Sequence, residues 1–238
     1  MKRDRSGDPP KTAAELMAEL DSDPEYVARI KALQEQRARA VEQSLLDAKP
    51  ILMDLASAGF QVDTVADLFN RNMNYEGAIP ILLFWITRIT DPAVKEDVIR
   101  ALTVPWAKPA AALPLVQEFR LAADEGMRWA IANALSVVAD DAVLDDVIQL
   151  DTDVRNGKAR EMLALALGNM KNPQAVSVLT DLLNDAQVVG HAVMALGTLN
   201  AKGARSSVEK LASHPTKWIR KEVQKALAQI DACSDEHQ

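Results

Sequence analysis

The sequence predicts an all-α fold, an α-α superhelix in which about five helical hairpins stack as a right-handed solenoid. Composition, length and an internal repeat support this prediction. Hydrophobic residues make up 48% of the 238 residues and aromatic residues only 4%, with alanine and leucine abundant. Small and unbranched side chains favour packed helices, whereas sheets favour β-branched and aromatic residues. The length is at the upper end for one compact domain, so a repeat array is expected.

The dipeptide Ala-Leu recurs through the C-terminal part of the chain at nearly constant spacing. Successive copies lie 33, 32, 29 and 31 residues apart, and each falls late in an amphipathic helix pattern. The copies are Ala101-Leu102, Ala134-Leu135, Ala166-Leu167, Ala195-Leu196 and Ala226-Leu227. A period of this length marks one helical hairpin per repeat. We therefore expect ten helices in five hairpins, with Ala134, Ala166 and Ala195 buried where second helices approach.

Other positions keep the phase of this Ala-Leu marker and define the second helix of each hairpin. Ten residues before each marker stands a residue able to accept backbone N–H hydrogen bonds at a helix start. These residues are Asp91, Asp124, Asn156, Asp185 and Thr216. Six residues before the marker a basic side chain follows an apolar one in four of five repeats. The basic residues are Lys95, Arg128, Arg160 and Arg220, with Val189 in the remaining repeat.

The first helix of each hairpin is expected to open 20 to 23 residues before the marker. The predicted starts are Ala78, Ala112, Val143, Ala175 and Ala204. Two of them are followed closely by proline, which the first turn of a helix tolerates because its N–H groups have no intrahelical partner.

Residues 166–185, ALGNMKNPQAVSVLTDLLND, resemble the short HEAT-like repeats of bacteria, including those of the phycobilin-lyase type. The resemblance covers roughly residues 77–231. It implies that first helices line a convex side, that second helices line a concave side, and that Asp and Arg side chains form a ladder between neighbouring repeats. The sequence departs from that ladder at Val189, where the base is missing, and at Asn156 and Thr216, where the acid is replaced.

Four segments are expected along the chain: a flexible segment 1–22, a helical cap 23–76, the repeat array 77–231 and a disordered tail 232–238. Asp23-Pro24-Glu25 predicts the start of a long exposed helix, which Pro50 should kink or restart. A second segment from Ile51 to Ser57 and a short helix from Val62 to Phe69 complete the cap. Such a cap hides the apolar face of a terminal repeat.

Charge and composition exclude several classes of function. The net charge of −7 argues against a general nucleic-acid binder. Nine acids against two bases lie in 118–153, whereas seven bases against two acids lie in 202–225. The N-terminus lacks the apolar core of a signal peptide, and the longest apolar stretch, 78–86, is too short for a bilayer. We therefore expect no membrane association and a cytoplasmic, bacterial protein.

The sequence predicts no catalytic residue, no metal and no cofactor. The candidate base on a second helix, His191, has no carboxylate one turn away to orient it. Cys233 is the single cysteine, and three histidines supply a zinc site poorly. The aspartates at 140–146 lack the glycine and terminal glutamate of an EF-hand, and no glycine-rich phosphate loop occurs.

Side chains five residues and one residue before each marker should point out of the second helices, where a solenoid binds its partners. The candidate partner-binding residues are Arg100, Trp129, Asn133, Leu165, Met194, Lys221 and Lys225. We expect Trp129, Leu165 and Met194 to anchor the partner and the two lysines to steer it. The alternative, that the apolar members fill gaps between neighbouring helices, stays open.

The expected function is a non-enzymatic scaffold that binds a protein partner on the concave face. Two alternatives remain. One is a nucleic-acid-binding or DNA-repair protein with the same fold. The other is an acidic, immunity-type protein that neutralises a basic partner through residues 118–153. Neither the identity of the partner nor the oligomeric state follows from the sequence.

Overall fold

The computed structural model describes residues 11–71, 73–170 and 172–232, and contains no strand within them. The chain divides into two compact units, Met1–Leu46 and Asp47–Gln238. Helix α2 (Pro24–Ser57) begins in the first unit and ends in the second. The predicted all-α fold is confirmed.

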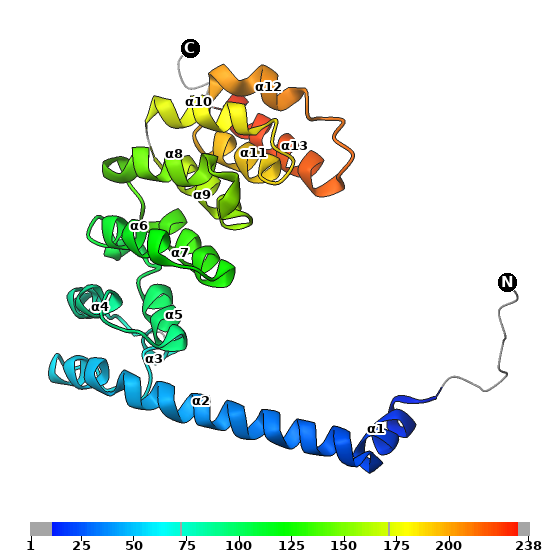
Figure 1. Cartoon of the computed structure of the whole chain (residues 1–238). Helices are drawn as coiled ribbons and strands as arrows, with labels where there is room; N and C mark the ends of the chain where they lie inside the picture. The colour runs from blue at the N-terminus through cyan, green and yellow to red at the C-terminus, as the bar shows by residue number, and fades with distance from the viewer. Residues whose placement is uncertain (1–10, 72, 171, 233–238) are drawn as a thin grey trace, which may run out of the picture. The chain divides into compact units, whose positions relative to one another are not determined.

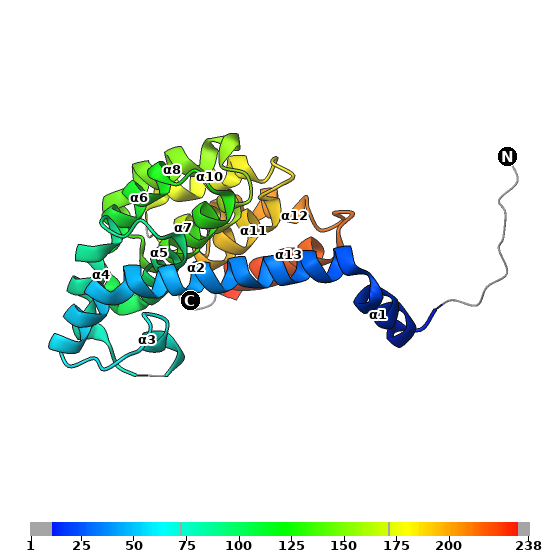
Figure 2. The same ribbon diagram turned by 60° about the horizontal axis from the view of Figure 1, so that its bottom comes forward.

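In its described residues, the second unit contains five helical hairpins. The first helices of the hairpins are α4 (Ile79–Ile86), α6 (Ala112–Leu121), α8 (Leu144–Thr152), α10 (Pro173–Leu182) and α12 (Arg205–Glu209). The second helices are α5 (Pro92–Ala101), α7 (Glu125–Val138), α9 (Ala159–Gly168), α11 (Val189–Thr198) and α13 (Lys217–Ala232). Each second helix packs against that of the next repeat, and Figures 1 and 2 show the two sets as separate layers. The hairpins predicted from the Ala-Leu period are confirmed.

The core lies between these two layers. Ala134, Ala166 and Ala195 are buried, as the period predicts, and so are the leucines that follow them. Short 3-10 helices complete the connections between elements. They are η1 (Glu76–Ala78), η2 (Pro105–Ala107), η3 (Asp141–Val143), η4 (Val154–Asn156) and η5 (Lys202–Ala204).

Side-chain caps fix where several second helices begin. Asp91 Oδ1 accepts a hydrogen bond from Val94 N at 2.9 Å, and Asp124 Oδ1 accepts one from Met127 N at 2.9 Å. Each bond satisfies a first-turn N–H group that has no intrahelical partner. The predicted caps of α5 and α7 are therefore confirmed. The predicted cap of α11 is wrong: Asp185 accepts from Gln187 N at 2.9 Å in the turn before the helix, whose N-cap residue is Val188.

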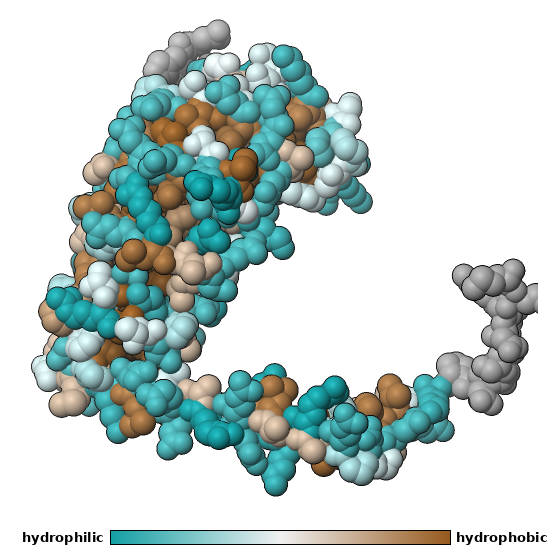
Figure 3. Space-filling model, in the orientation of Figure 1, coloured by the Kyte–Doolittle hydropathy of each residue, from teal (hydrophilic) through white to brown (hydrophobic). Residues whose placement is uncertain are grey.

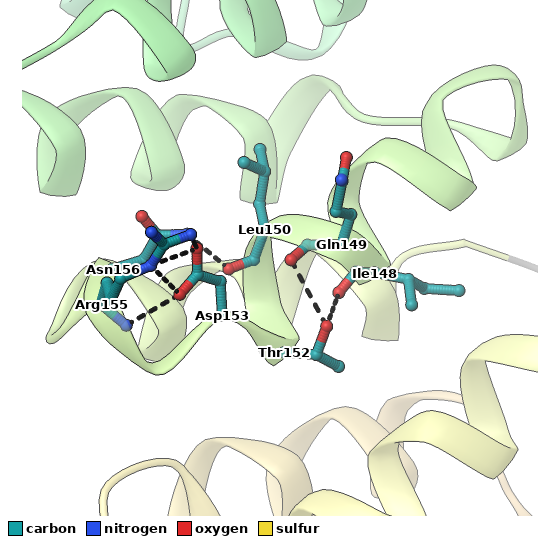
Figure 4. Close-up of polar contacts among 7 residues, drawn as sticks. All are labelled: Ile148, Gln149, Leu150, Thr152, Asp153, Arg155 and Asn156. Carbon is teal, nitrogen blue, oxygen red and sulfur yellow. Dashed lines mark hydrogen bonds and ion pairs between the residues drawn. The ribbon is translucent and has the colours of Figure 1, made fainter.

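Asn156 does not cap α9, contrary to the prediction. It lies at the end of η4, is buried, and its Nδ2 donates to the Leu150 carbonyl oxygen at 2.7 Å (Figure 4). The chain then turns at Gly157, whose φ of 52° favours glycine, before α9 begins at Ala159. The buried amide therefore closes the C-terminal end of α8, where helix carbonyls lack intrahelical partners.

The N-terminal region departs from the prediction in three places. Helix α1 (Ala13–Ser22) lies within the segment predicted to be flexible, and Thr12 and Glu15 form a capping box at its start. Helix α2 does not restart at Pro50, because the buried Ile51 and Leu55 hold its last turns in the core. Helix α3 is only Asp67–Asn70, so it overlaps the predicted helix at 62–69 in its last three residues alone. The predicted tail lies outside the described residues, apart from Ala232, which ends α13.

Candidate binding cleft on the second-helix face

The surface presented by α5, α7, α9, α11 and α13 is named here the second-helix face. A cleft of about 1120 Å³ opens at its N-terminal end, between α5, α7 and the segment that precedes α4. The apolar and aromatic lining comes mainly from Phe69, Tyr75, Val104, Met127 and Trp129. The polar lining comes from Glu96, Arg100, Thr103, Asp124 and Asn133. The cleft therefore combines aromatic surface with a few fixed polar groups, as ligand sites commonly do.

Trp129 and Asn133 lie one turn apart on α7 and both line the cleft. Helix α7 buries Ile131 and Leu135 in the core. Trp129 and Asn133, which are also four residues apart, lie on another face of α7 and point away from the core. Trp129 retains 42% of its surface exposed. The Asn133 side-chain amide makes no hydrogen bond to any described residue. The pair thus offers an indole surface beside a free amide.

The charged groups of the cleft are tied to their own helices. Arg100 Nη2 donates to Glu96 Oε1 at 2.6 Å, one turn back on α5. Asp124 uses Oδ1 to cap α7, and the Thr103 hydroxyl donates to the Ile99 carbonyl oxygen at 2.8 Å. Two carboxylates and one guanidinium therefore line the cleft in held positions, with a small excess of negative charge.

Tyr75 forms part of the cleft wall and was not among the residues predicted from sequence. It is only 3% exposed, and its ring meets the Trp106 ring edge-on at a centroid distance of 5.7 Å. Its buried hydroxyl has no hydrogen-bond partner among the described residues. Burial also raises the pKa of Tyr75, so the hydroxyl keeps its proton at neutral pH. A buried hydroxyl in this state favours any neighbour that can hydrogen-bond to it.

The seven predicted residues do not form one patch. Arg100, Trp129 and Asn133 meet in the cleft. Leu165 on α9 and Met194 on α11 are half-buried and lie outside it. Lys221 and Lys225 are exposed on α13, where Lys225 Nζ pairs with Glu222 Oε1 at 2.7 Å.

A second aromatic residue on this face, Trp218, was also not among the predicted partner-binding residues. A Cβ atom placed on Gly190 would lie 1.8 Å from Trp218 Cη2, so the indole of α13 covers this glycine of α11. The His191 ring lies 5.7 Å from the Trp218 ring. Burial lowers the pKa of His191, while the charge of Glu161 opposes that shift. The signal in the sequence is the glycine at 190, where the second repeat carries Trp129.

The Asp-Arg contact implied by the resemblance occurs between the third and fourth repeats. Arg160 Nη2 pairs with Asp185 Oδ2 at 2.7 Å, and Arg160 Nε donates to the backbone oxygen of Asp151. Asp151 is fully buried, and its carboxylate oxygens have no hydrogen-bond partner among the described residues. Burial raises its pKa to about 7, although Arg160 lowers it. In the first repeat, Lys95 instead pairs with Glu118 at 2.6 Å.

The described residues contain neither a group placed to hold a metal ion nor a helix suited to cross a membrane. Across 11–71, 73–170 and 172–232, no group of three or more His, Cys, Asp or Glu side chains is placed to hold a metal ion. Over the same ranges, no helix has both the length and the apolar character needed to cross a membrane.

Comparison with known proteins gives one family match and a structural likeness. Residues 159–185, from the start of α9 to the turn before α11, match the family described as PBS lyase HEAT-like repeat. The crystal structure of an engineered protein from the Northeast Structural Genomics Consortium is similar with a TM-score of 0.51 and 21% sequence identity. That similarity covers 78% of this chain and 97% of the engineered one, and it shows the fold alone. No curated protein matches the sequence.

Proposed function

We propose that this chain, a HEAT-like repeat protein, is a non-enzymatic scaffold that binds a segment of a partner protein in the cleft of the second-helix face. The observation that carries the proposal is the half-exposed Trp129 beside the unpaired amide of Asn133. Tryptophan is enriched among residues that dominate the binding energy of protein interfaces. The amide supplies a donor and an acceptor for the backbone of the bound segment.

The chemistry of the cleft favours binding over catalysis. Among the described residues that line it there is no histidine or cysteine, and the Thr103 hydroxyl already donates to a backbone oxygen. A hydrolytic site needs a nucleophile within reach of a base that a third group orients. The lining residues therefore support recognition of a ligand and not attack on it.

The charges of the second-helix face favour a protein partner over nucleic acid. A phosphate chain in the cleft would meet Glu96 and Asp124, and Arg100 is already paired with Glu96. In the last repeat, Lys225 of α13 pairs with Glu222 at 2.7 Å, and Arg220 donates to the backbone oxygens of His214 and Pro215 at 2.6 and 2.8 Å. Binding of a nucleic-acid backbone requires unpaired bases in a continuous row.

The acidic stretch at 118–153 also has fewer free carboxylates than its sequence suggests. Glu118 is buried and paired with Lys95, Asp146 pairs with Arg120 at 2.6 Å, and Asp151 is buried. Carboxylates engaged in this way stabilise the fold and do not present charge to a basic partner. Neutralisation of a basic protein through this stretch is therefore the less favoured function.

The test uses a displayed random-peptide library selected on the full-length protein, because it requires no knowledge of the natural partner. Selected peptides, labelled for fluorescence polarisation, are titrated against the wild type, Trp129→Ala and Leu113→Ala. Leu113 is the matched control, since it is 51% exposed but lies on the first helix α6. We expect Trp129→Ala to weaken binding by about 2 kcal/mol, near thirtyfold, with Leu113→Ala unchanged.

Two results would contradict the scaffold proposal. One is selection of peptides that bind Trp129→Ala as tightly as the wild type. The other is tight, salt-sensitive binding of a labelled DNA duplex by the full-length protein, which would favour the nucleic-acid alternative.

A further inference from the structure

The helical arm is defined as the described residues 11–46, comprising α1 and the part of α2 up to Leu46. None of its residues is buried. Seven of its large apolar side chains are 40 to 60% exposed, and Figure 3 shows hydrophobic residues at the surface along the arm. These side chains are Leu16, Met17, Val27, Leu33, Val41, Leu45 and Leu46. So many exposed apolar residues on a short segment mark an interaction surface.

Charges of opposite sign are segregated along the arm. Residues 15–25 carry five acidic residues and no base, whereas residues 29–39 carry four basic residues and one acid. The acidic part includes most of α1, and the basic part lies wholly on α2. The arm therefore contains an acidic stretch and a basic stretch that attract each other when they lie side by side.

Within one arm, the acidic stretch 15–25 and the basic stretch 29–39 cannot lie side by side. Only Asp23 separates α1 from α2, and its backbone is extended, with φ −84° and ψ 111°. Two antiparallel helices need a connection of about two to five residues to pack side by side. Helix α1 therefore cannot fold back onto residues 29–39 of its own chain.

We propose that two copies of this chain associate through their helical arms, with α1 of each copy lying along residues 29–39 of the other. The contact is self-complementary, so one two-fold axis satisfies both arms at once. The lengths match: the ten residues of α1 span about 15 Å and residues 29–39 about 16 Å. Leu16 and Met17 of one copy then cover Leu33 of the second copy.

Other occupants fit the arm less well. Residues 11–46 carry seven acidic and five basic side chains. An anionic lipid surface or a nucleic-acid backbone would attract residues 29–39 but would be repelled by the five acidic residues of 15–25, so neither occupant satisfies the whole arm. A second copy supplies both signs of charge in the required order. The inference is independent of the proposed cleft function.

The test is sedimentation equilibrium of the full-length protein with two charge-reversal variants. The acidic set becomes basic in Glu19→Lys with Asp21→Lys, and the basic set becomes acidic in Arg29→Glu with Arg37→Glu, which lie four residues before and after Leu33 on α2. We expect the wild type to be a dimer. In each variant the dissociation constant of the dimer should rise about tenfold or more, because two-fold symmetry makes every like-charge contact occur twice. An equimolar mixture of the two variants should restore the dimer.

Controls separate this pairing from general charge effects. Lys210→Glu with Lys217→Glu changes the net charge as much, outside the arm, and should leave the dimer intact. Circular dichroism checks that each variant keeps its helicity. Removal of the apolar contact in Leu16→Ser with Leu33→Ser should also give monomers. A wild type that stays monomeric up to about 100 μM, far above a typical specific affinity, would overturn the proposal. So would reversal variants that remain dimeric, or a mixture that does not reassociate.

Discussion

The second-helix face carries the 1120 Å³ cleft beside its first two helices, whereas α9 and α11 pack closely against each other, although both regions repeat the same sequence period. Two residues after the Ala of the marker, the first two repeats carry Thr103 and Ser136, and the third carries Gly168. A Cβ atom on Gly168 would lie 2.7 Å from Ala195 Cβ and 2.8 Å from Ala195 Cα. Helices α9 and α11 thus approach closely, whereas Thr103 lines an open cleft. The third repeat thus differs from the first in how closely its second helix approaches the next one.

The two tryptophans of this face show the same contrast. Trp129 lines the cleft, whereas Trp218 fills the space left by Gly190. Their exposures are nearly equal, at 42% and 45%. Exposure alone therefore does not distinguish a binding residue from a packing residue, but the contacts of the side chain do.

The largest effect is expected for Gly168→Ala, which places a methyl group against the backbone of α11. The two helices must move apart, and overpacking of this kind costs about 1–3 kcal/mol of unfolding free energy. Urea denaturation followed by circular dichroism measures the loss. Gly203→Ala is the control, because a Cβ atom there meets nothing within 4 Å. Equal stability of the two variants would contradict the close packing of α9 against α11 at Gly168.

The buried charge of the third repeat gives a pH-dependent effect of similar size. The pKa of Asp151 is raised from 3.8 to about 7 by burial, so the folded state binds more protons than the unfolded state between these values. The unfolding free energy should therefore fall as pH rises from about 4 to 7. We expect Asp151→Asn to remove that decrease and to be about 1–3 kcal/mol more stable than the wild type at pH 8.

Denaturation of the wild type and Asp151→Asn at pH 5 and pH 8 measures this difference. Asp153→Asn is the control, since hydrogen bonds from Arg155 lower the pKa of Asp153 to about 2. That carboxylate loses its contribution only as the pH falls below about 4, so the control should leave the interval from pH 5 to pH 8 unchanged. A variant Asp151→Asn with the wild-type pH profile would contradict the buried-charge interpretation.

A smaller effect should separate the two tryptophans. Trp218→Ala uncovers Gly190 and His191, and we expect a loss of about 1–2 kcal/mol of stability from the partly exposed site. Trp129→Ala should change stability by no more than about 0.5 kcal/mol, as surface substitutions do. Thermal melts of both variants provide the comparison. A larger loss of stability for Trp129→Ala would show that Trp129 is a packing residue and would contradict its role as a binding residue of the cleft.

The smallest effect is expected on α13. The pair Lys225–Glu222 is exposed at the lysine, and such pairs contribute about 0.2–1 kcal/mol. Lys225→Glu with Lys221→Glu should therefore leave the melting temperature nearly unchanged, and, because both lysines lie outside the cleft, any change in the association rate of a cleft-binding peptide should come from long-range steering and depend on salt. Stopped-flow fluorescence at two salt concentrations measures the rate. An association rate that ignores both charge and salt would exclude steering by these lysines.

The sequence by itself determined the repeat period, the five hairpins and the helix starts at Asp91 and Asp124. These features depend on interactions within a few residues of chain, such as a capping bond or apolar spacing along one helix. Arg100, Trp129 and Asn133 could be chosen in the same way, because outward-facing positions follow from the helical period.

Only the tertiary structure decided which side chains from different repeats share one space. Tyr75 enters the cleft from outside the array, Trp218 covers a glycine of another helix, and Asn156 turns back to the Leu150 carbonyl. Leu165 and Met194 match the outward positions but lie apart from the cleft. Periodicity gives the direction of a side chain from its own helix, but the distance to the next helix depends on how the side chains of both helices pack, as at Gly168 against Ala195.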